Sequence, residues 1–125
     1  MERYYEGYLY DTENSELITR YETDLPTDDS EYYTEELRKA PNGKYFLHGE
    51  GNVLSPYSYT PYEEDEFQFY ESGEDLIPLT FEEAKKWYEK KLDICYRYMS
   101  IKNAKDPVPN YQTYCQLFGS KEADK

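Results

Sequence analysis

The sequence predicts an α+β fold, with an antiparallel β-sheet of four to five strands and a C-terminal helical segment packed on one face. The first half of the chain holds short segments rich in tyrosine and β-branched residues, which favour strands. The dipeptide Asn42–Gly43, a strong hairpin signal, separates two of these segments. A helix-capping pattern and apolar residues at helical spacing follow in the second half. Tyrosine supplies 17 of the 125 residues, so we expect a thin core built largely from its rings.

The length of the chain predicts one domain. We expect residues 1–119 to form a single α+β unit and residues 120–125 to form a disordered tail. No stretch approaches the roughly 20 apolar residues that span a bilayer, and the first residues hold no apolar signal-peptide core. We therefore expect a cytoplasmic protein of a bacterial host. Cys95 and Cys115 belong to no CxxC pattern, and we expect free thiols.

The first half of the chain predicts four strands. Tyr4–Tyr10 and Glu16–Thr23 read as strands that form an antiparallel hairpin over a short loop. Tyr33–Lys39 fits a helix or a strand, and the hairpin signal at Asn42–Gly43 decides for a strand because a hairpin needs an upstream partner. Lys44–Gly51 is the downstream strand.

A long connection precedes the last predicted strand. Residues 52–73 read as a loop with a short strand or helix near Phe67–Tyr70, and long loops in compact domains are often functional. Asp75–Leu79 is predicted to be an edge strand because Pro78 cannot donate to a ladder.

The C-terminal part predicts helices. Thr80 and Glu83 match a capping box, which places the start of a helix that runs through about Leu92. Apolar spacing continues to Ile101, either in the same helix or in a second one. Tyr111–Phe118 reads as a last helical turn or two.

The acidic residues are concentrated in two segments. The chain carries 27 Asp and Glu against 14 Lys and Arg, a net charge of -13. Asp11–Glu36 holds ten acids and one base, and Glu63–Asp75 holds seven acids and no base, which leaves the remaining residues at net +3. Clustered like charge destabilises a fold by self-repulsion. Such clusters suggest a binding surface, although a merely solvated face is the alternative.

Acids interleaved with tyrosines suit a basic partner. Alternate strand residues lie about 6.6 Å apart on one face, comparable with successive phosphates of a nucleic-acid strand. Tyrosine rings stack on arginine guanidinium groups. We therefore predict a surface that mimics nucleic acid and binds a basic groove of another protein. The candidate partner-binding residues are Asp24, Asp28, Asp29, Glu31, Glu35, Glu36, Glu63, Glu64, Asp65, Glu66 and Glu71.

Other chemistries have weaker support. His48 and Glu50 stand two apart, so they could act as an acid/base pair, yet they fit a surface polar pair as well. Gly49 and Gly51 lack the lysine and the helix start of a phosphate loop. The acidic runs lack the calcium-loop pattern, and one histidine offers no zinc spacing. We expect no catalytic residues, no metal and no cofactor.

Three segments resemble small proteins carried by phages, plasmids and conjugative elements of Firmicutes. The segments are Tyr-Tyr-x-Gly-x-Leu-Tyr-Asp-Thr at Tyr4–Thr12, Gly-Lys-Tyr-Phe-Leu-His-Gly-Glu-Gly at Gly43–Gly51, and Ile-Pro-Leu-Thr-x-Glu-Glu-Ala at Ile77–Ala84. Together they are similar to the domain of some type II-A anti-CRISPR proteins, inhibitors of the type II RNA-guided Cas nuclease. The acidic segment Glu63–Asp75 and the residues after Leu92 depart from the family pattern.

The resemblance implies a non-enzymatic inhibitor of a CRISPR effector. Such a nuclease holds its guide heteroduplex in a positively charged channel. An acidic protein in that groove would block guide RNA loading or DNA binding. Two alternatives remain open: a nuclease that acts on guide RNA through His48 and Glu50, and an acidic interaction module that targets another basic host DNA-binding protein. We expect no direct nucleic-acid binding and no membrane association.

Overall fold

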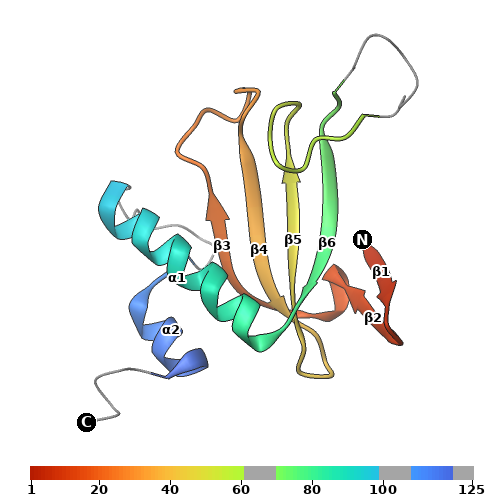
Figure 1. The fold of residues 1–125 in the computed structure, drawn as a ribbon, viewed down its shortest axis with the longest axis vertical. Coiled ribbons are helices and arrows are strands. Elements are labelled where there is room, and N and C mark those ends of the chain that lie inside the picture. Colours follow the sequence, from red (N-terminus) through yellow and green to blue (C-terminus); the bar gives the residue numbers. More distant parts are fainter. Residues whose placement is uncertain (61–69, 99–107, 120–125) are drawn as a thin grey trace.

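The protein folds as a four-stranded antiparallel sheet, a two-stranded hairpin and two helices, which confirms the predicted α+β class (Figure 1). The computed structural model describes residues 1–60, 70–98 and 108–119. Strand order in the main sheet is β3-β4-β5-β6. The elements are β1 Glu2–Tyr5, β2 Tyr8–Asp11, the 3-10 turn Thr12–Asn14, β3 Glu16–Glu22, β4 Tyr33–Lys39, β5 Tyr45–Gly51, β6 Gly73–Leu79, α1 Phe81–Tyr98 and α2 Tyr111–Phe118.

The first predicted strand is wrong, because the chain reverses in its middle. Glu6 and Gly7 both have positive φ, 49° and 88°, which gives the two-residue turn that joins β1 to β2. Glycine adopts such a φ without strain. The tyrosine-rich residues on both sides fit a strand, so their pattern does not reveal the turn between them. The hairpin predicted between this segment and β3 does not form, since β3 pairs with β4.

The β4–β5 hairpin forms where the sequence predicts it. The Ala40 amide donates to the Lys44 carbonyl at 2.8 Å, and the Gly43 amide donates to the Ala40 carbonyl at 2.9 Å. Gly43 has φ 87°, a value that glycine adopts readily. The bounds of β4 are those expected, Tyr33–Lys39.

The start of α1 confirms the capping box. The Glu83 amide donates to Thr80 Oγ1 at 3.1 Å, and the Thr80 amide donates to Glu83 Oε1 at 2.9 Å. Of the two alternatives after Leu92, the continuing helix is the one that forms, because α1 runs as one helix to Tyr98. In α2 the Asn110 side chain caps the helix by accepting from the Thr113 amide at 2.8 Å.

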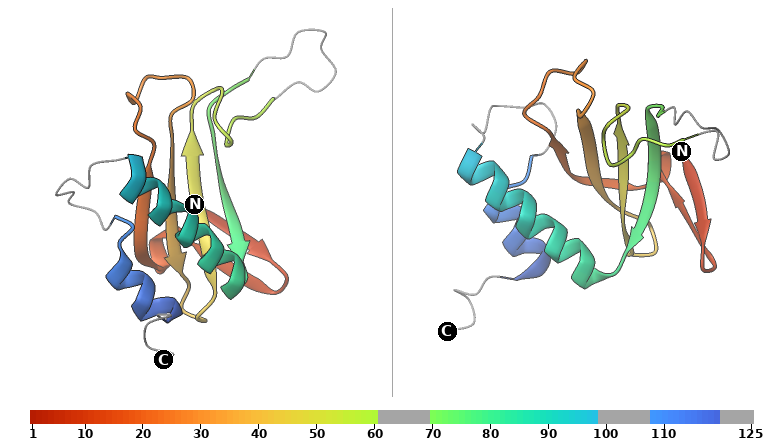
Figure 2. Two further views of the ribbon diagram at one scale, coloured as in Figure 1. Left: turned by 60° about the vertical axis from the view of Figure 1, so that its left-hand side comes forward. Right: turned by 45° about the horizontal axis from the view of Figure 1, so that its top comes forward.

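The two faces of the main sheet are covered differently (Figure 2). On one face Leu37, Tyr45 and Leu47 pack against Ala84 and Tyr88 of α1, and α2 adds further rings. On the other face a smaller cluster joins Tyr10 of β2 to Ala40, Phe46 and Leu76. The β1–β2 hairpin therefore covers the second face only near the β4–β5 turn. At the opposite end of this face, no helix or strand of residues 1–60, 70–98 and 108–119 packs on the sheet.

Some predictions lie outside the described residues or concern the whole chain. The structure does not describe the tail 120–125. It also does not describe the predicted element near Phe67–Tyr70, apart from Tyr70 itself. As predicted, β6 is an edge strand that carries Pro78. Cys95 and Cys115 are free thiols. None of the helices in the described ranges has the length and apolar character needed to cross a bilayer.

Candidate functional site

The open sheet face carries a row of acids. Residues paired directly across antiparallel strands project from the same face. The row at the open end is Glu22, Thr34, Glu50 and Glu74, one residue from each strand. Glu50 and Glu74 are direct neighbours, and opposed like charges destabilise a sheet by a few tenths of a kcal/mol to about 1 kcal/mol. The carboxylate of Glu50 is exposed and makes no ion pair or hydrogen bond in the described part of the chain.

The next row is a charged hydrogen-bond network centred on His48. Its Nδ1 lies 3.0 Å from Glu36 Oε1, and its Nε2 lies 2.8 Å from Glu74 Oε2. The hydrogen bond to Glu36 and the two nearby carboxylates raise the pKa of His48 above its usual 6.5, against the effect of burial. The same bond, with help from Arg38, lowers the pKa of Glu36 to about 2. The two carboxylates therefore favour the imidazolium form of His48.

Arg38 ties this network to the β2–β3 connection. Its Nε donates to Glu36 Oε1 at 3.0 Å, and its guanidinium also donates to the Thr12 carbonyl at 3.1 Å. The Glu36 carboxylate thus pairs with both His48 and Arg38, so its negative charge is largely compensated within the fold. This limits what Glu36 can offer to a partner.

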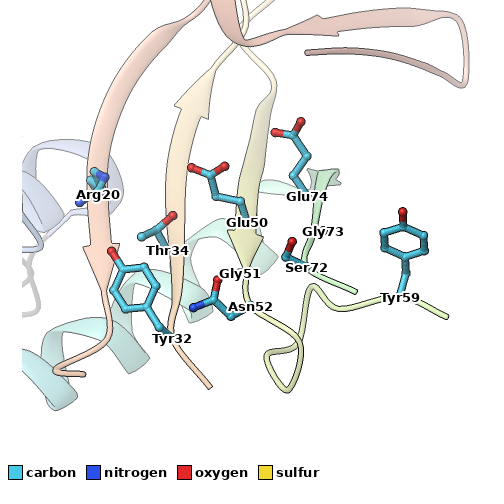
Figure 3. A pocket seen from close by; sticks show the side chains of 10 residues that line it. All are labelled: Arg20, Tyr32, Thr34, Glu50, Gly51, Asn52, Tyr59, Ser72, Gly73 and Glu74. Atoms are coloured by element: carbon cyan, nitrogen blue, oxygen red, sulfur yellow. The ribbon is translucent and has the colours of Figure 1, made fainter. Parts of the chain in front are cut away.

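The open end of the face forms a hollow of about 620 Å³ (Figure 3). Strand residues make its floor, and Tyr32 and Tyr59 stand on either side. Its lining consists of Arg20, Tyr32, Thr34, Glu50, Gly51, Asn52, Tyr59, Ser72, Gly73 and Glu74. The two halves differ in charge. On the β3 side Arg20 lies 3.3 Å from Glu22, whereas the β5–β6 side holds Glu50 and Glu74 without an arginine or lysine in the lining.

The β3–β4 loop adds acids at the same end of the sheet. Asp24, Asp28, Asp29 and Glu31 lie between the end of β3 and the start of β4. Asn52 fastens this loop to the end of β5, because its amide donates to the Thr27 carbonyl at 2.9 Å and to the Asp29 carbonyl at 2.7 Å. Together with the hollow these residues form the acidic end: Glu22, Asp24, Asp28, Asp29, Glu31, Glu50, Glu71 and Glu74.

Glu35, predicted to bind a partner, lies instead in the core. Its side chain is only 12% exposed and points to the helix face, where Lys91 Nζ lies 3.1 Å from Oε1. Trp87 Nε1 donates to the same oxygen at 3.1 Å, and the Tyr57 hydroxyl donates to the other. Burial and the carboxylate raise the pKa of Tyr57, which keeps this hydroxyl protonated. Because strand side chains alternate, Glu35 and Glu36 could not share a face.

The remaining predicted residues divide between the acidic end and the undescribed segment. Glu71 accepts from the Tyr59 hydroxyl at 2.9 Å beside the hollow. Glu63, Glu64, Asp65 and Glu66 lie outside the described residues. Glu22, Thr34 and Glu74 are not among the predicted partner-binding residues, and Glu50 is predicted only as a partner of His48. The signal that could have found them is the strand register, which a single sequence leaves open.

The geometry of His48 suits a structural role more than acid/base chemistry. Both ring nitrogens are engaged by carboxylates, so neither is free to exchange a proton with a substrate in this arrangement. Within residues 1–60, 70–98 and 108–119 no three His, Cys, Asp or Glu side chains are grouped to hold a metal ion. The open face offers carboxylates and phenol rings, which are groups that bind cations.

The raised pKa of His48 makes a pH-dependent contribution to stability. The contribution is fully present below the unfolded pKa of about 6.5 and is lost as the pH rises through the folded pKa. We expect the free energy of unfolding of the wild type to fall over this window by about 1 kcal/mol or more, and His48→Gln to remove that fall. Urea unfolding at pH 6 and pH 9 measures both.

The proton signal of His48, the single histidine of the chain, gives an independent titration. We expect a midpoint above 6.5. A midpoint at or below 6.5, or an equal pH slope in His48→Gln, would contradict the bridging role.

The function of this site is inferred from its geometry and charge, because comparisons with known proteins do not identify it. The hollow, the unpaired Glu50 and the acidic loop are the features that bear on function. No protein-family model, no curated protein and no solved structure matches this chain.

Proposed function

We propose that the protein is a non-enzymatic inhibitor that binds a basic nucleic-acid-binding groove of a type II CRISPR effector nuclease through its acidic end. Binding there would block guide RNA loading or DNA binding. The resemblance of Tyr4–Thr12, Gly43–Gly51 and Ile77–Ala84 to anti-CRISPR proteins motivates the choice of partner. The basic groove of such a nuclease binds nucleic acid through the charge of its backbone rather than through its base sequence. A protein surface that carries many negative charges can therefore compete for the groove.

The observation that carries the proposal is the placement of charge at the open end of the sheet. Glu50 and Glu74 face each other across β5 and β6 on the face opposite to the one that α1 and α2 cover. The β3–β4 loop extends this charge beyond the strands, and Arg20 is the one base in the lining of the hollow. A fold that gathers its acids on one side offers the anionic surface that a basic groove requires.

The affinity would come from many modest contacts. Each exposed ion pair contributes about 0.2–1 kcal/mol and is screened by salt. Four such pairs sum to about 1–4 kcal/mol, which is about fivefold to several-hundredfold in Kd. Fast electrostatically steered encounter would add to the advantage over slower competitors.

Removing four charges from the acidic end should weaken binding to the guide-free nuclease by about fivefold or more. The variant is Asp24→Asn, Asp28→Asn, Glu31→Gln and Glu50→Gln, whose side chains make no ion pair within the described residues. Titration calorimetry at about 0.1 M salt measures Kd, and a thermal melt checks that the fold is kept.

The matched control removes four exposed acids elsewhere and so has the same net charge. It combines Glu2→Gln, Glu13→Gln, Glu82→Gln and Glu89→Gln, which lie on β1, the 3-10 turn and α1. We expect near wild-type Kd for this control. Equal loss in both variants would mean that net charge alone acts, and no loss in either would overturn the acidic end as the contact surface.

A further inference from the structure

The β5–β6 half of the hollow has the groups of a receptor for one cationic side chain. Thr34 stands in its floor between Glu22 and Glu50. Its side chain points into the hollow, yet the residue is only 5% exposed (Figure 3). The Thr34 hydroxyl makes no hydrogen bond in the described ranges. Since the described residues hold no buried side-chain oxygen without a partner, the Thr34 hydroxyl reaches the solvent in the hollow, where a ligand group can take the place of water as its partner.

The carboxylates beside Thr34 supply the charge. Glu50 is its direct neighbour on β5, and Glu74 is the next on β6. Glu74 already accepts from His48 through one oxygen, whereas the Glu50 carboxylate has no partner among the described residues. Two carboxylates from adjacent strands are about 5 Å apart at their Cβ atoms, within reach of a single planar cation.

The opposite half of the same hollow shows how a guanidinium is held here. Arg20 lies 3.3 Å from Glu22 Oε2, and the Tyr32 hydroxyl donates to that same oxygen. On the β5–β6 side the Tyr59 hydroxyl donates to Glu71 Oε2 at 2.9 Å, as the Tyr32 hydroxyl donates to Glu22. That side repeats the carboxylates and the phenol but supplies no arginine of its own.

We propose that this half of the hollow receives the guanidinium of one arginine from the basic partner. The proposal rests on the proposed function and names the contact that anchors it. Glu50 accepts two parallel N–H bonds, and Thr34 accepts a third. Lysine fits less well, because its compact ammonium lacks the planar fork that spans two acceptors.

The test uses a small probe so that the receptor is examined without the nuclease. Amide NMR spectra of the protein are recorded during titration with n-propylguanidinium, and separately with n-butylammonium, at constant ionic strength. We expect saturable shifts at Gly51, Ser72 and Gly73 with the guanidinium, and binding at least about tenfold weaker with the ammonium.

Two variants and one control locate the site. Glu50→Gln is expected to weaken guanidinium binding by about tenfold or more, and Thr34→Val by a smaller factor without lowering the melting temperature. Glu31→Gln, on the β3–β4 loop outside the lining, is expected to bind as the wild type does. Equal shifts with both probes, no saturation, or equal loss in the Glu31 control would overturn the receptor.

The outcome separates this inference from the proposed function. Saturable guanidinium binding by a protein that fails to capture the nuclease would overturn the identity of the partner and support the arginine receptor. Capture of the nuclease without guanidinium binding would overturn the receptor and leave the acidic end as a diffuse contact.

Discussion

Replacing Lys91 with methionine is expected to lower the free energy of unfolding by about 3–5 kcal/mol. Lys91 is 11% exposed, and its Nζ lies 3.1 Å from Glu35 Oε1 and 4.2 Å from the centre of the Tyr21 ring. Without the ammonium, Glu35 would remain in the core as a carboxylate with only Trp87 and Tyr57 as donors. An unpaired buried charge costs much more than the pair itself contributes. Urea unfolding measures the loss.

Two companion variants separate charge from packing. Lys90→Met changes an exposed lysine of the same helix, and we expect a change below about 0.5 kcal/mol. The double variant Glu35→Gln with Lys91→Met removes both charges, and its loss is expected to be smaller than that of Lys91→Met alone. A Lys91→Met protein within about 1 kcal/mol of the wild type would contradict the burial of this pair.

Replacing Gly49 with alanine is expected to cost about 1–3 kcal/mol, because the added methyl group meets an aromatic ring. A Cβ at Gly49 would lie 1.8 Å from Tyr57 Cζ and 2.2 Å from Cε1. The ring cannot retreat freely, since its hydroxyl is bonded to the buried Glu35 and its face packs near Tyr33. Thermal and urea unfolding give the size of the loss.

The clash predicts that the two positions are coupled. Tyr57→Leu removes the ring end that the new methyl group would meet, at the cost of the hydrogen bond to Glu35. The double variant should therefore be more stable than the sum of the two single losses predicts. Additive losses would show that the ring of Tyr57 does not lie over Gly49.

Local signals in the sequence predicted the elements that local chemistry determines. Asn42–Gly43 placed the β4–β5 turn and Thr80 with Glu83 placed the start of α1, because turn and cap preferences act over a few residues. The turn at Glu6–Gly7 was missed because glutamate rarely takes positive φ, so the dipeptide reads as part of a strand.

The candidate site depended on information that is not local. Glu50 and Glu74 become neighbours through the pairing of β5 with β6, across a connection of more than twenty residues in the sequence. Glu35 and Glu36 are adjacent in the acidic segment, yet one is buried against Lys91 and the other bonds His48 on the opposite face. Charge density located the acidic end, but only the register separates its surface acids from its core acid.

The central claim is that the acidic end occupies a basic groove of the nuclease before the guide does. The most direct measurement is gel filtration of the protein with guide-free and guide-loaded nuclease at about 0.1 M salt, followed by guide RNA addition to the complex. We expect co-elution with the guide-free nuclease, blocked guide loading, and loss of the complex at about 1 M salt. Absence of co-elution with either form at about 0.1 M salt would contradict it.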